Sequence, residues 1–321
     1  MKISYKKLWK MQNLTTTTLG RTNLTVTAAG LGCGGFSRAG IDKGIDHAAS
    51  VVRAAYDAGV TFFDTAHAYG TQSAVGKGLS GLPRDSYALS TKFPYKSPDG
   101  CAAPEQVTAY LDNSLRELNV DYIDVWHIHA LLAEDYEYAK STLAPIMLKA
   151  KEQGKIRFLG VTEMFGRDTN HEMLPLVLND GLFDVIMVGC NLLNPSAAET
   201  VLPLAIEKNI AVLCMFAVRK ALHDRETLKR SIAKIRERGQ AVDGLDETSL
   251  DFLLEYAQTL PEAAYRFARH TPGNTVTLIG TGNIDHLHEN LRSIELPPLP
   301  DAALERLAEL FGNVDCVSGQ E

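Results

Sequence analysis

The sequence predicts an α/β fold in which eight parallel strands alternate with helices and close into a (β/α)8 TIM barrel, forming a single domain. The first observation is that apolar runs of strand length alternate with longer helical patterns, which implies parallel pairing. The runs cover residues 26–32, 60–63, 87–91, 122–129, 156–161, 184–190, 210–216 and 275–279. The second is the length of 321 residues with 45% hydrophobic residues, which suits one large barrel core.

A competing architecture, the doubly wound open sheet, lacks its usual signal. That fold requires a Gly-x-Gly-x-x-Gly turn that opens a helix after the first strand. We interpret the glycine-rich string from Gly30 to Gly35 as part of the first barrel strand and not as that fingerprint. The eightfold alternation therefore favours the closed barrel.

The N-terminal residues differ in composition from the rest of the chain. No Asp or Glu precedes Asp42, whereas Lys and Thr are frequent, a bias shared by organellar transit peptides. We interpret residues 1–14 as an exposed extension and expect a short hairpin after it, with Asn23 in its turn, to close the barrel floor. The barrel domain then covers residues 15–321, and a transit peptide is the alternative for the extension.

Two segments between the expected strands have clear helical patterns. The apolar residues of the first are Val107, Leu111, Leu115 and Leu118. Those of the second are Ile146, Leu148 and Ala150, and the second ends before Gly154, a plausible helix stop. Both segments are expected on the outside of the barrel.

Residues from about 217 to 247, after the seventh expected strand, interrupt the regular pattern with a basic segment. Its cations are Arg219, Lys220, Arg225, Lys229, Arg230, Lys234, Arg236 and Arg238. One interpretation is a solvated helix with charge pairs four residues apart. The other is a loop that folds over an anionic ligand at the barrel mouth.

Bulk composition limits the possible partners and compartment. The formal net charge is −7 and no extended basic stripe exists, which argues against nucleic acid as the main partner. No apolar run approaches the roughly 18 residues of a membrane span. The five cysteines form no Cys-x-x-Cys pair, which fits the reducing cytoplasm. Small molecules are therefore the expected partners.

Polar side chains stand at or just after the ends of three neighbouring expected strands. They are Asp64, Tyr69, Lys92 and His129. Because the carboxyl ends of barrel strands lie on one face, we expect these four side chains to converge there. The convergence predicts an active site.

These four residue types suit reversible hydride transfer to a carbonyl group. Negative charge builds up on the carbonyl oxygen, so a proton donor is needed, and Tyr69 is the candidate. A free phenol titrates near 10, and a neighbouring Lys92 ammonium would stabilise the phenolate. Asp64 would keep Lys92 charged, and His129 would orient the carbonyl oxygen.

His127 and His129 offer a rival interpretation as paired metal ligands. They stand two residues apart on a strand and therefore face the same side. Metal-dependent hydrolases need further His or Asp ligands at later strand ends, and those ends carry no histidine here. We therefore expect no metal.

The string from Asp64 to Gly70 resembles the aldo-keto reductase superfamily, whose Asp-Thr-Ala-x-x-Tyr-Gly pattern it matches at each fixed position. The resemblance extends from the first strand near Leu31 to the helix after Asn283. It implies a (β/α)8 barrel that binds NADP(H) or NAD(H) without a Rossmann domain. It also assigns the same four roles to Asp64, Tyr69, Lys92 and His129.

The resemblance further implies a set of cofactor-binding residues. They are Gly32, Cys33, Thr162, Phe216, Gly280, Thr281, Gly282, Asn283, Glu289 and Asn290. Arg219 is a further cofactor-binding candidate, which comes from the basic segment and lies outside the resemblance. Glu289 and Asn290 match positions that meet the adenine, and Phe216 is our choice, over Met215, for the aromatic that stacks on the nicotinamide. Backbone N–H groups from Gly280 to Asn283, ahead of a helix, would also form an anion site.

Three positions depart from the family pattern. In the family, a basic residue near the position of Gly282 usually holds the 2′-phosphate of NADP, and this chain has no cation there. Either the basic segment supplies the missing charge or NAD is used. Glu163 replaces an Asn that recognises the nicotinamide carboxamide. Met187 occupies the place of a Gln and is expected to pack in the core.

These patterns predict an oxidoreductase that reduces aldehydes or ketones to alcohols. An NAD(P)-linked sugar or alcohol dehydrogenase working in the oxidative direction is the nearest alternative, because one site catalyses both directions. A dinucleotide-binding regulatory subunit with little turnover is an alternative from a different class.

Overall fold

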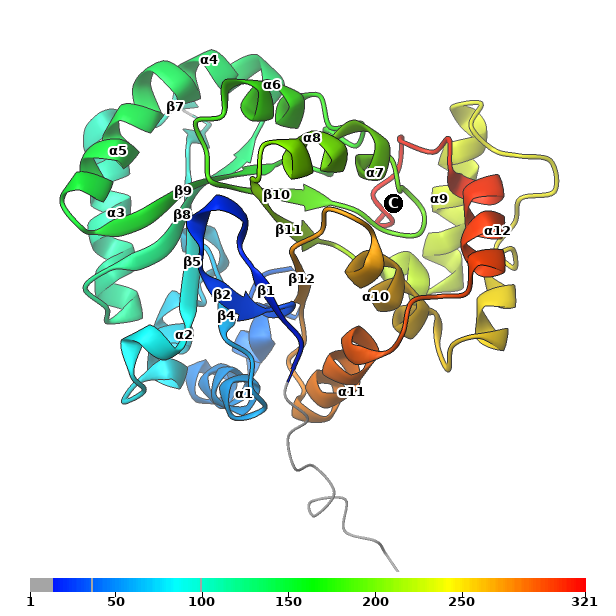
Figure 1. The fold of residues 1–321 in the computed structure, drawn as a ribbon, viewed down its shortest axis with the longest axis horizontal. Helices are drawn as coiled ribbons and strands as arrows, with labels where there is room; N and C mark the ends of the chain where they lie inside the picture. Colours follow the sequence, from blue (N-terminus) through cyan, green and yellow to red (C-terminus); the bar gives the residue numbers. More distant parts are fainter. Residues whose placement is uncertain (1–13, 36, 99) are drawn as a thin grey trace, which may run out of the picture.

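The computed structural model describes residues 14–35, 37–98 and 100–321. Eight parallel strands form a closed barrel in the order β10-β11-β12-β3-β4-β5-β8-β9 (Figure 1). Their bounds are Ala29–Gly32 (β3), Phe62–Asp64 (β4), Ala88–Pro94 (β5), Ile123–Leu131 (β8), Ile156–Glu163 (β9), Val185–Gly189 (β10), Ala211–Met215 (β11) and Val276–Ile279 (β12). The predicted (β/α)8 barrel is confirmed, and each strand overlaps its predicted run.

A hairpin of β1 (Thr16–Thr18) and β2 (Thr25–Thr27) precedes the barrel. Asn23 lies between the strands in the left-handed region, with φ of 57°. Leu19 and Val26 are buried in an apolar cluster with residues of the barrel interior such as Val125. The hairpin therefore closes one end of the barrel as predicted, whereas nearly all of the predicted extension 1–14 lies outside the described residues.

Helices surround the barrel (Figure 1). They are α1 (Ile45–Asp57), α2 (Gln72–Leu79), α3 (Pro104–Leu118), α4 (Tyr136–Tyr138), α5 (Ala144–Glu152), α6 (Met173–Asp180), α7 (Ala197–Thr200), α8 (Leu202–Glu207), α10 (Leu260–His270) and α11 (Ile284–Glu295). Helix α5 ends before Gly154 as expected, but Leu148 is 41% exposed, and Met147 takes the buried position instead. None of the helices in the described residues is long and apolar enough to span a membrane.

The glycine-rich string after β3 does not open a helix directly. A short 3-10 segment, Arg38–Lys43, follows it, and α1 begins only at Ile45. Gly34 has a packing role, because a Cβ there would lie 2.4 Å from an atom of the Tyr69 ring. The string therefore makes room for Tyr69 and differs from the turn of a doubly wound sheet.

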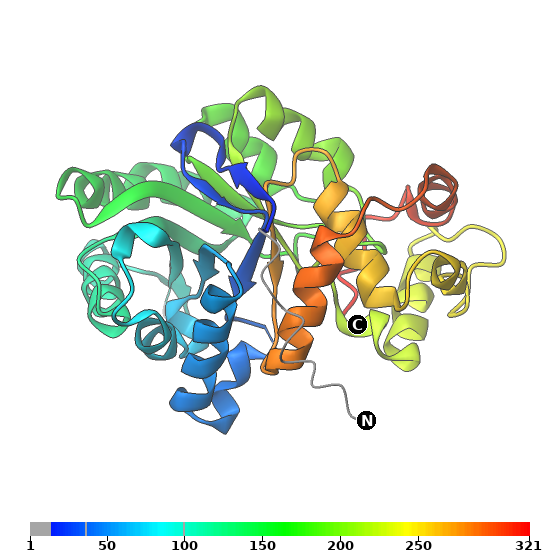
Figure 2. The ribbon, with the colours of Figure 1, turned by 60° about the horizontal axis from the view of Figure 1, so that its bottom comes forward.

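The basic segment forms helix α9 (Arg225–Glu237), which packs beside the barrel with α12 (Asp301–Phe311) (Figures 1 and 2). Its apolar face joins a second hydrophobic cluster that includes Ile232, Leu253 and Phe311. Most of its cations are exposed, as in the interpretation of a solvated helix. Arg219 and Lys220 precede α9 and line a cleft instead. The helical part of the segment therefore agrees with the interpretation of a solvated helix, and the part before it agrees with that of a loop at the barrel mouth.

Candidate active site

Neighbouring strands bring the four predicted catalytic residues together. Asp64 ends β4, Lys92 lies in β5 and His129 lies near the end of β8, while Tyr69 ends a short 3-10 turn, His67–Tyr69, after β4. Strand β5 pairs with both β4 and β8. The order of the strands therefore places the four side chains at one mouth of the barrel.

A buried ion pair forms the base of the site. Lys92 Nζ donates to Asp64 Oδ2 at 2.6 Å and to the carbonyl oxygen of Thr65 at 2.8 Å. Ser90 Oγ donates to the other Asp64 oxygen at 2.7 Å. Burial alone lowers the pKa of Lys92, but its interactions with the Asp64 carboxylate, and then with Tyr69, outweigh burial and raise that pKa above its usual value. The ammonium therefore stays charged at neutral pH.

Tyr69 lies between this ammonium and His129. Lys92 Nζ is 4.9 Å from the centre of the Tyr69 ring, and the Tyr69 hydroxyl is 3.4 Å from His129 Nε2. Burial raises the pKa of Tyr69, and the Lys92 charge acts in the opposite direction. The phenol therefore holds its proton at neutral pH, and Lys92 is close enough to favour the phenolate once the proton has left.

His129 is neutral at physiological pH. Burial, followed by the Lys92 charge, lowers its pKa from 6.5 to about 3. Its ring meets that of Tyr69 edge to face, with centroids 5.3 Å apart. A neutral imidazole can donate one hydrogen bond to a substrate oxygen without taking the proton of Tyr69.

His127 shares the interior face with His129 but is fully buried within the barrel. A Cβ at Gly160 would lie 2.2 Å from His127 Nδ1, so the imidazole packs against the backbone of β9. Burial holds the pKa of His127 well below its usual value. Within the described ranges, no three His, Cys, Asp or Glu side chains are grouped to hold a metal ion.

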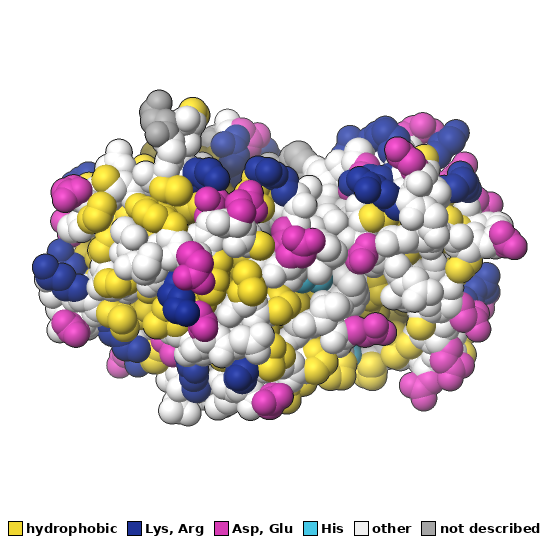
Figure 3. Space-filling model, turned by 90° about the horizontal axis from the view of Figure 1, so that it is seen from above, with side chains coloured by type: hydrophobic (Ala, Val, Ile, Leu, Met, Phe, Trp, Pro, Cys, Tyr) yellow, Lys and Arg dark blue, Asp and Glu magenta, His cyan; other side chains and the backbone are white. Residues whose placement is uncertain are grey.

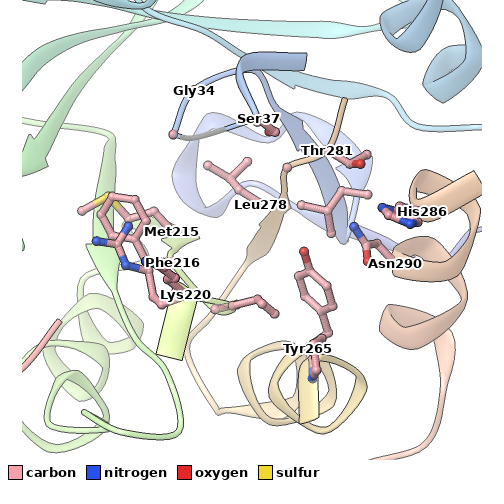
Figure 4. Close-up of a pocket in the computed structure, with 18 of the residues that line it drawn as sticks. Gly34, Ser37, Met215, Phe216, Lys220, Tyr265, Leu278, Thr281, His286 and Asn290 are labelled. Carbon is pink, nitrogen blue, oxygen red and sulfur yellow. The ribbon is translucent and has the colours of Figure 1, made fainter. Parts of the chain in front are cut away.

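A cleft of about 1170 Å³ extends from the catalytic residues to α11. The molecule is hollowed between the barrel and the smaller mass that contains α9 and α12 (Figure 3). Asp64, Tyr69, Met215 and Phe216 line one part of the cleft. The rest is lined by residues of α10, β12 and α11, of the loops after β3 and β11, and of the C-terminal segment. Met215 and Phe216 lie on one side, across from Tyr265, His286 and Asn290 (Figure 4).

The predicted cofactor residues divide into two groups. Those that line the cleft are Gly32, Phe216, Arg219, Gly280, Thr281, Glu289 and Asn290. The side chain of Asn283 caps α11 by accepting from two backbone N–H groups, and the backbone of Gly282 packs against Gly40. Cys33 and Thr162 are buried, and the Thr162 hydroxyl accepts from the backbone N–H of Ala130.

Glu163 is not among the residues that line the cleft. Its carboxylate accepts from the backbone N–H of Gly189 at 2.6 Å and pairs with His171 Nδ1 at 2.8 Å. Both side chains are fully buried. Met187, which was expected to be core, is 2% exposed but also lines the cleft.

Several cleft residues were not singled out from the sequence. They are Ser37, His223, Thr259, Tyr265, His286, Gln320 and Glu321. Most belong to loops, helix termini and the C-terminal segment, where a single sequence carries no periodic signal for which way a side chain points. His286 lies within the helix expected after Asn283, and its spacing three residues before Glu289 was the available signal.

The fold and the site together define a barrel enzyme with acid–base residues at the carboxyl ends of its strands. The family model described as "Aldo/keto reductase family" matches residues 30–311. The chain therefore belongs to the aldo/keto reductase family, whose members are NAD(P)H-dependent oxidoreductases.

Comparisons with individual proteins agree with this assignment. The chain is 31% identical to the L-galactose dehydrogenase of Arabidopsis thaliana over 61% of its own length, and spans 62% of that relative. It is 26% identical to "Probable aldo-keto reductase 1" of Glycine max over 94% of this chain and 90% of the relative. The holo form of an aldo-keto reductase from Bacillus halodurans shares the fold, with a TM-score of 0.73 and 21% identity over 96% of this chain and all of the other.

Proposed function

We propose that this protein interconverts a carbonyl compound and its alcohol by hydride transfer with NADP(H) or NAD(H), and that Tyr69 moves the proton. The observation that carries the proposal is the arrangement of Tyr69 between the charged Lys92 and the neutral His129, at one end of the cleft. In the direction of reduction, the enzyme acts on an aldehyde or ketone.

The cleft fits a dinucleotide. Its volume of about 1170 Å³ exceeds the roughly 300–1000 Å³ typical of small-ligand pockets. The N-terminus of α11, capped by Asn283, offers a positive helix end, and Arg219 and Lys220 line the opposite part of the cleft. When bound, the nicotinamide supplies the hydride in reduction and accepts it in oxidation.

The protein residues then handle the proton and the charge. During reduction, the electron pair of the carbonyl bond moves to oxygen, and Tyr69 gives its hydroxyl proton to that oxygen as the new C–H bond forms. Lys92 stabilises the resulting phenolate, and Asp64 keeps Lys92 charged. His129 hydrogen-bonds the substrate oxygen and holds it near the phenol. Oxidation reverses each step.

The charge missing near Gly282 has candidate replacements among the residues that line the cleft. Lys220 and His223 follow β11, and His286 lies in the first turn of α11. Burial, followed by the charge of His286, lowers the pKa of His223, and both residues line the cleft. We propose that Lys220 favours NADP(H) over NAD(H) by meeting the 2′-phosphate.

A second direction of reaction has one specific observation in its favour. The relative from Arabidopsis thaliana is named L-galactose dehydrogenase. A sugar or polyol oxidised at one hydroxyl is therefore the second candidate substrate class.

The unpaired cysteines, of which Cys33, Cys190 and Cys214 are buried, support a cytoplasmic location for either activity.

The test follows the absorbance of the reduced nicotinamide with an activated aromatic aldehyde and NADPH or NADH, and runs the oxidative assay with aldose sugars in parallel. Replacing Tyr69 with Phe should lower kcat by roughly 10²- to 10⁴-fold, because the proton donor is lost. The Kd of the cofactor should change little. A Tyr69→Phe variant with near-normal kcat would overturn the assigned role, and no turnover in either direction would overturn the proposed activity.

A further inference from the structure

The ring of Phe216 is held in an unusual backbone conformation at the end of β11. Its φ is +64°, in the left-handed region that bulky residues rarely adopt. Strain of this kind persists where the surrounding contacts hold the residue in place, and it gathers at ligand sites. The contacts of this ring therefore indicate how the cleft receives a ligand.

One set of contacts joins Phe216 to the protein interior. Its ring stacks with that of Phe165, with centroids 6.2 Å apart. Phe165 stacks in turn on His171 at 5.6 Å, and His171 Nδ1 lies 2.8 Å from the buried carboxylate of Glu163. Phe165 is 1% exposed and packs directly on Gly189. This part of the stack is rigidly enclosed and cannot open for a ligand.

The other contact comes from Arg219 and lies in the cleft. Its guanidinium carbon is 3.9 Å from the centre of the Phe216 ring, and both residues line the cleft. Arg219 Nε is buried and has no hydrogen-bond partner among the described residues. Burial lowers the pKa of Arg219 to about 10, so it is charged at neutral pH. This side chain is therefore the contact of Phe216 that can yield.

We propose that Arg219 gates the stacking site for the nicotinamide: the guanidinium covers Phe216 in the empty cleft, and the nicotinamide ring displaces it when the dinucleotide binds. The inference rests on the proposed function, because it requires a nicotinamide ligand. Arg219 is then a positioning residue with two opposite effects. It weakens the binding of the nicotinamide half of the ligand and strengthens the binding of the diphosphate half.

The displaced cation has a partner in the same ligand. The diphosphate lies between the two halves of the dinucleotide, and an Arg guanidinium can bind it through two parallel N–H groups. Arg219 thus competes with the nicotinamide half for Phe216 and attracts the diphosphate half. A residue that only supported Phe216 would strengthen the binding of the nicotinamide half instead.

The experiment measures the binding of two fragments, reduced nicotinamide riboside and ADP-ribose, by calorimetry to wild type and to Arg219→Ala. Without the competing guanidinium, the riboside, which carries no phosphate, should bind roughly twofold to fivefold tighter to the variant. ADP-ribose, which carries the diphosphate but no nicotinamide, should bind at least threefold weaker. Weaker or unchanged binding of the riboside would overturn the gate.

Arg219→Lys is the matched control, because it keeps the charge but lacks the planar group. It should restore most of the ADP-ribose affinity and leave the riboside tighter than in wild type. Phe216→Leu should weaken the riboside whichever residue is present at 219. If wild type oxidises NADPH but Arg219→Ala does not change the affinities for the riboside and ADP-ribose in opposite directions, the gate alone is wrong. If wild type binds neither the dinucleotide nor either fragment, both the gate and the proposed function are wrong.

Discussion

At the scale of single residues, the site depends on side chains whose protonation states are fixed by burial and by neighbouring charges. Lys92 stays charged because Asp64 lies 2.6 Å away, and His129 stays neutral because burial and the Lys92 charge both oppose its protonation. Neutral His129 and protonated Tyr69 therefore coexist 3.4 Å apart over a wide pH range. In the proposed mechanism, this arrangement leaves the phenol as the group that gives up a proton.

His129 should make the stability of the protein depend on pH. Its pKa is about 3 in the folded state and 6.5 in the unfolded state, so only the unfolded state binds this proton between those values. The contribution of His129 to the free energy of unfolding should fall as the pH drops from 6.5 toward 3. Urea unfolding of wild type and His129→Gln from pH 7.5 to 4.5 measures it.

The informative quantity is the difference between the two proteins at each pH. As the pH falls, the free energy of unfolding of wild type should decrease relative to that of His129→Gln, because Gln has no proton to gain. Wild-type and variant curves that run parallel over the whole range would show that His129 is not held neutral by the fold.

The convergence of the four predicted catalytic residues could be predicted from the sequence, whereas the surroundings of Phe216 could not. Asp64, Lys92 and His129 lie on strands, where strand order alone fixes which ends are neighbours. Glu163 was expected at the carboxamide, but the loop after β9 brings His171 to it, and its buried carboxylate does not line the cleft. Loop conformation decides such contacts, and no periodic pattern records it.

At the scale of elements, close approach between strands β8 and β9 fixes the barrel interior under the site. His127 and Gly160 are paired in the register of these strands. The absence of a side chain at Gly160 gives the imidazole its space. The position of His129, two residues further along β8, therefore depends on a glycine in the neighbouring strand.

Gly160→Ala should destabilise the protein by about 1–3 kcal/mol, because the added methyl group would lie 2.2 Å from His127 Nδ1 and neither strand can move freely. Gly166→Ala is the matched control, since nothing lies within 4 Å of a Cβ there. Denaturant unfolding at pH 7 compares both variants with wild type. Equal stability of the two variants would mean that the barrel interior adapts more easily than its packing indicates.

The barrel strands agree closely with the predicted apolar runs, but the buried faces of the helices agree less well with the predicted helical patterns. All eight runs overlap barrel strands because buried parallel strands are apolar on both faces. In α5, Leu148 points outward and Met147 inward, a choice that depends on how the helix is rotated against the barrel. The sequence pattern there contained too few apolar residues to fix that rotation.

At the scale of the whole molecule, the cleft lies between the barrel and the cluster built on α9 and α12. That cluster joins residues about 80 positions apart in sequence, such as Ile232 and Phe311, and was not predicted because no local pattern pairs distant helices. The C-terminal segment contacts both parts, because Arg230 Nε of α9 donates to the carbonyl oxygen of Glu321 and Asn194 Nδ2, in the loop after β10, donates to that of Val317. A ligand in the cleft should therefore stabilise both parts together.

This coupling yields a test of cofactor preference. A ligand that binds only the folded protein raises its free energy of unfolding, by about 2.7 kcal/mol at a concentration 100 times its Kd. If Lys220 meets the 2′-phosphate, Lys220→Ala should weaken NADPH about fivefold and remove about 1 kcal/mol of that stabilisation at the same concentration. NADH should stabilise wild type and variant equally. Chemical unfolding at a series of cofactor concentrations measures both effects.

Lys229→Ala is the appropriate control, because Lys229 is exposed on α9 and does not line the cleft. It should leave stabilisation by either cofactor unchanged, whereas a loss equal to that of Lys220→Ala would indicate a general effect of net charge. A loss with NADPH and NADH alike in Lys220→Ala would move Lys220 to the diphosphate, which both cofactors share. Only a loss confined to NADPH shows that a cation from the loop after β11 replaces the one missing near Gly282.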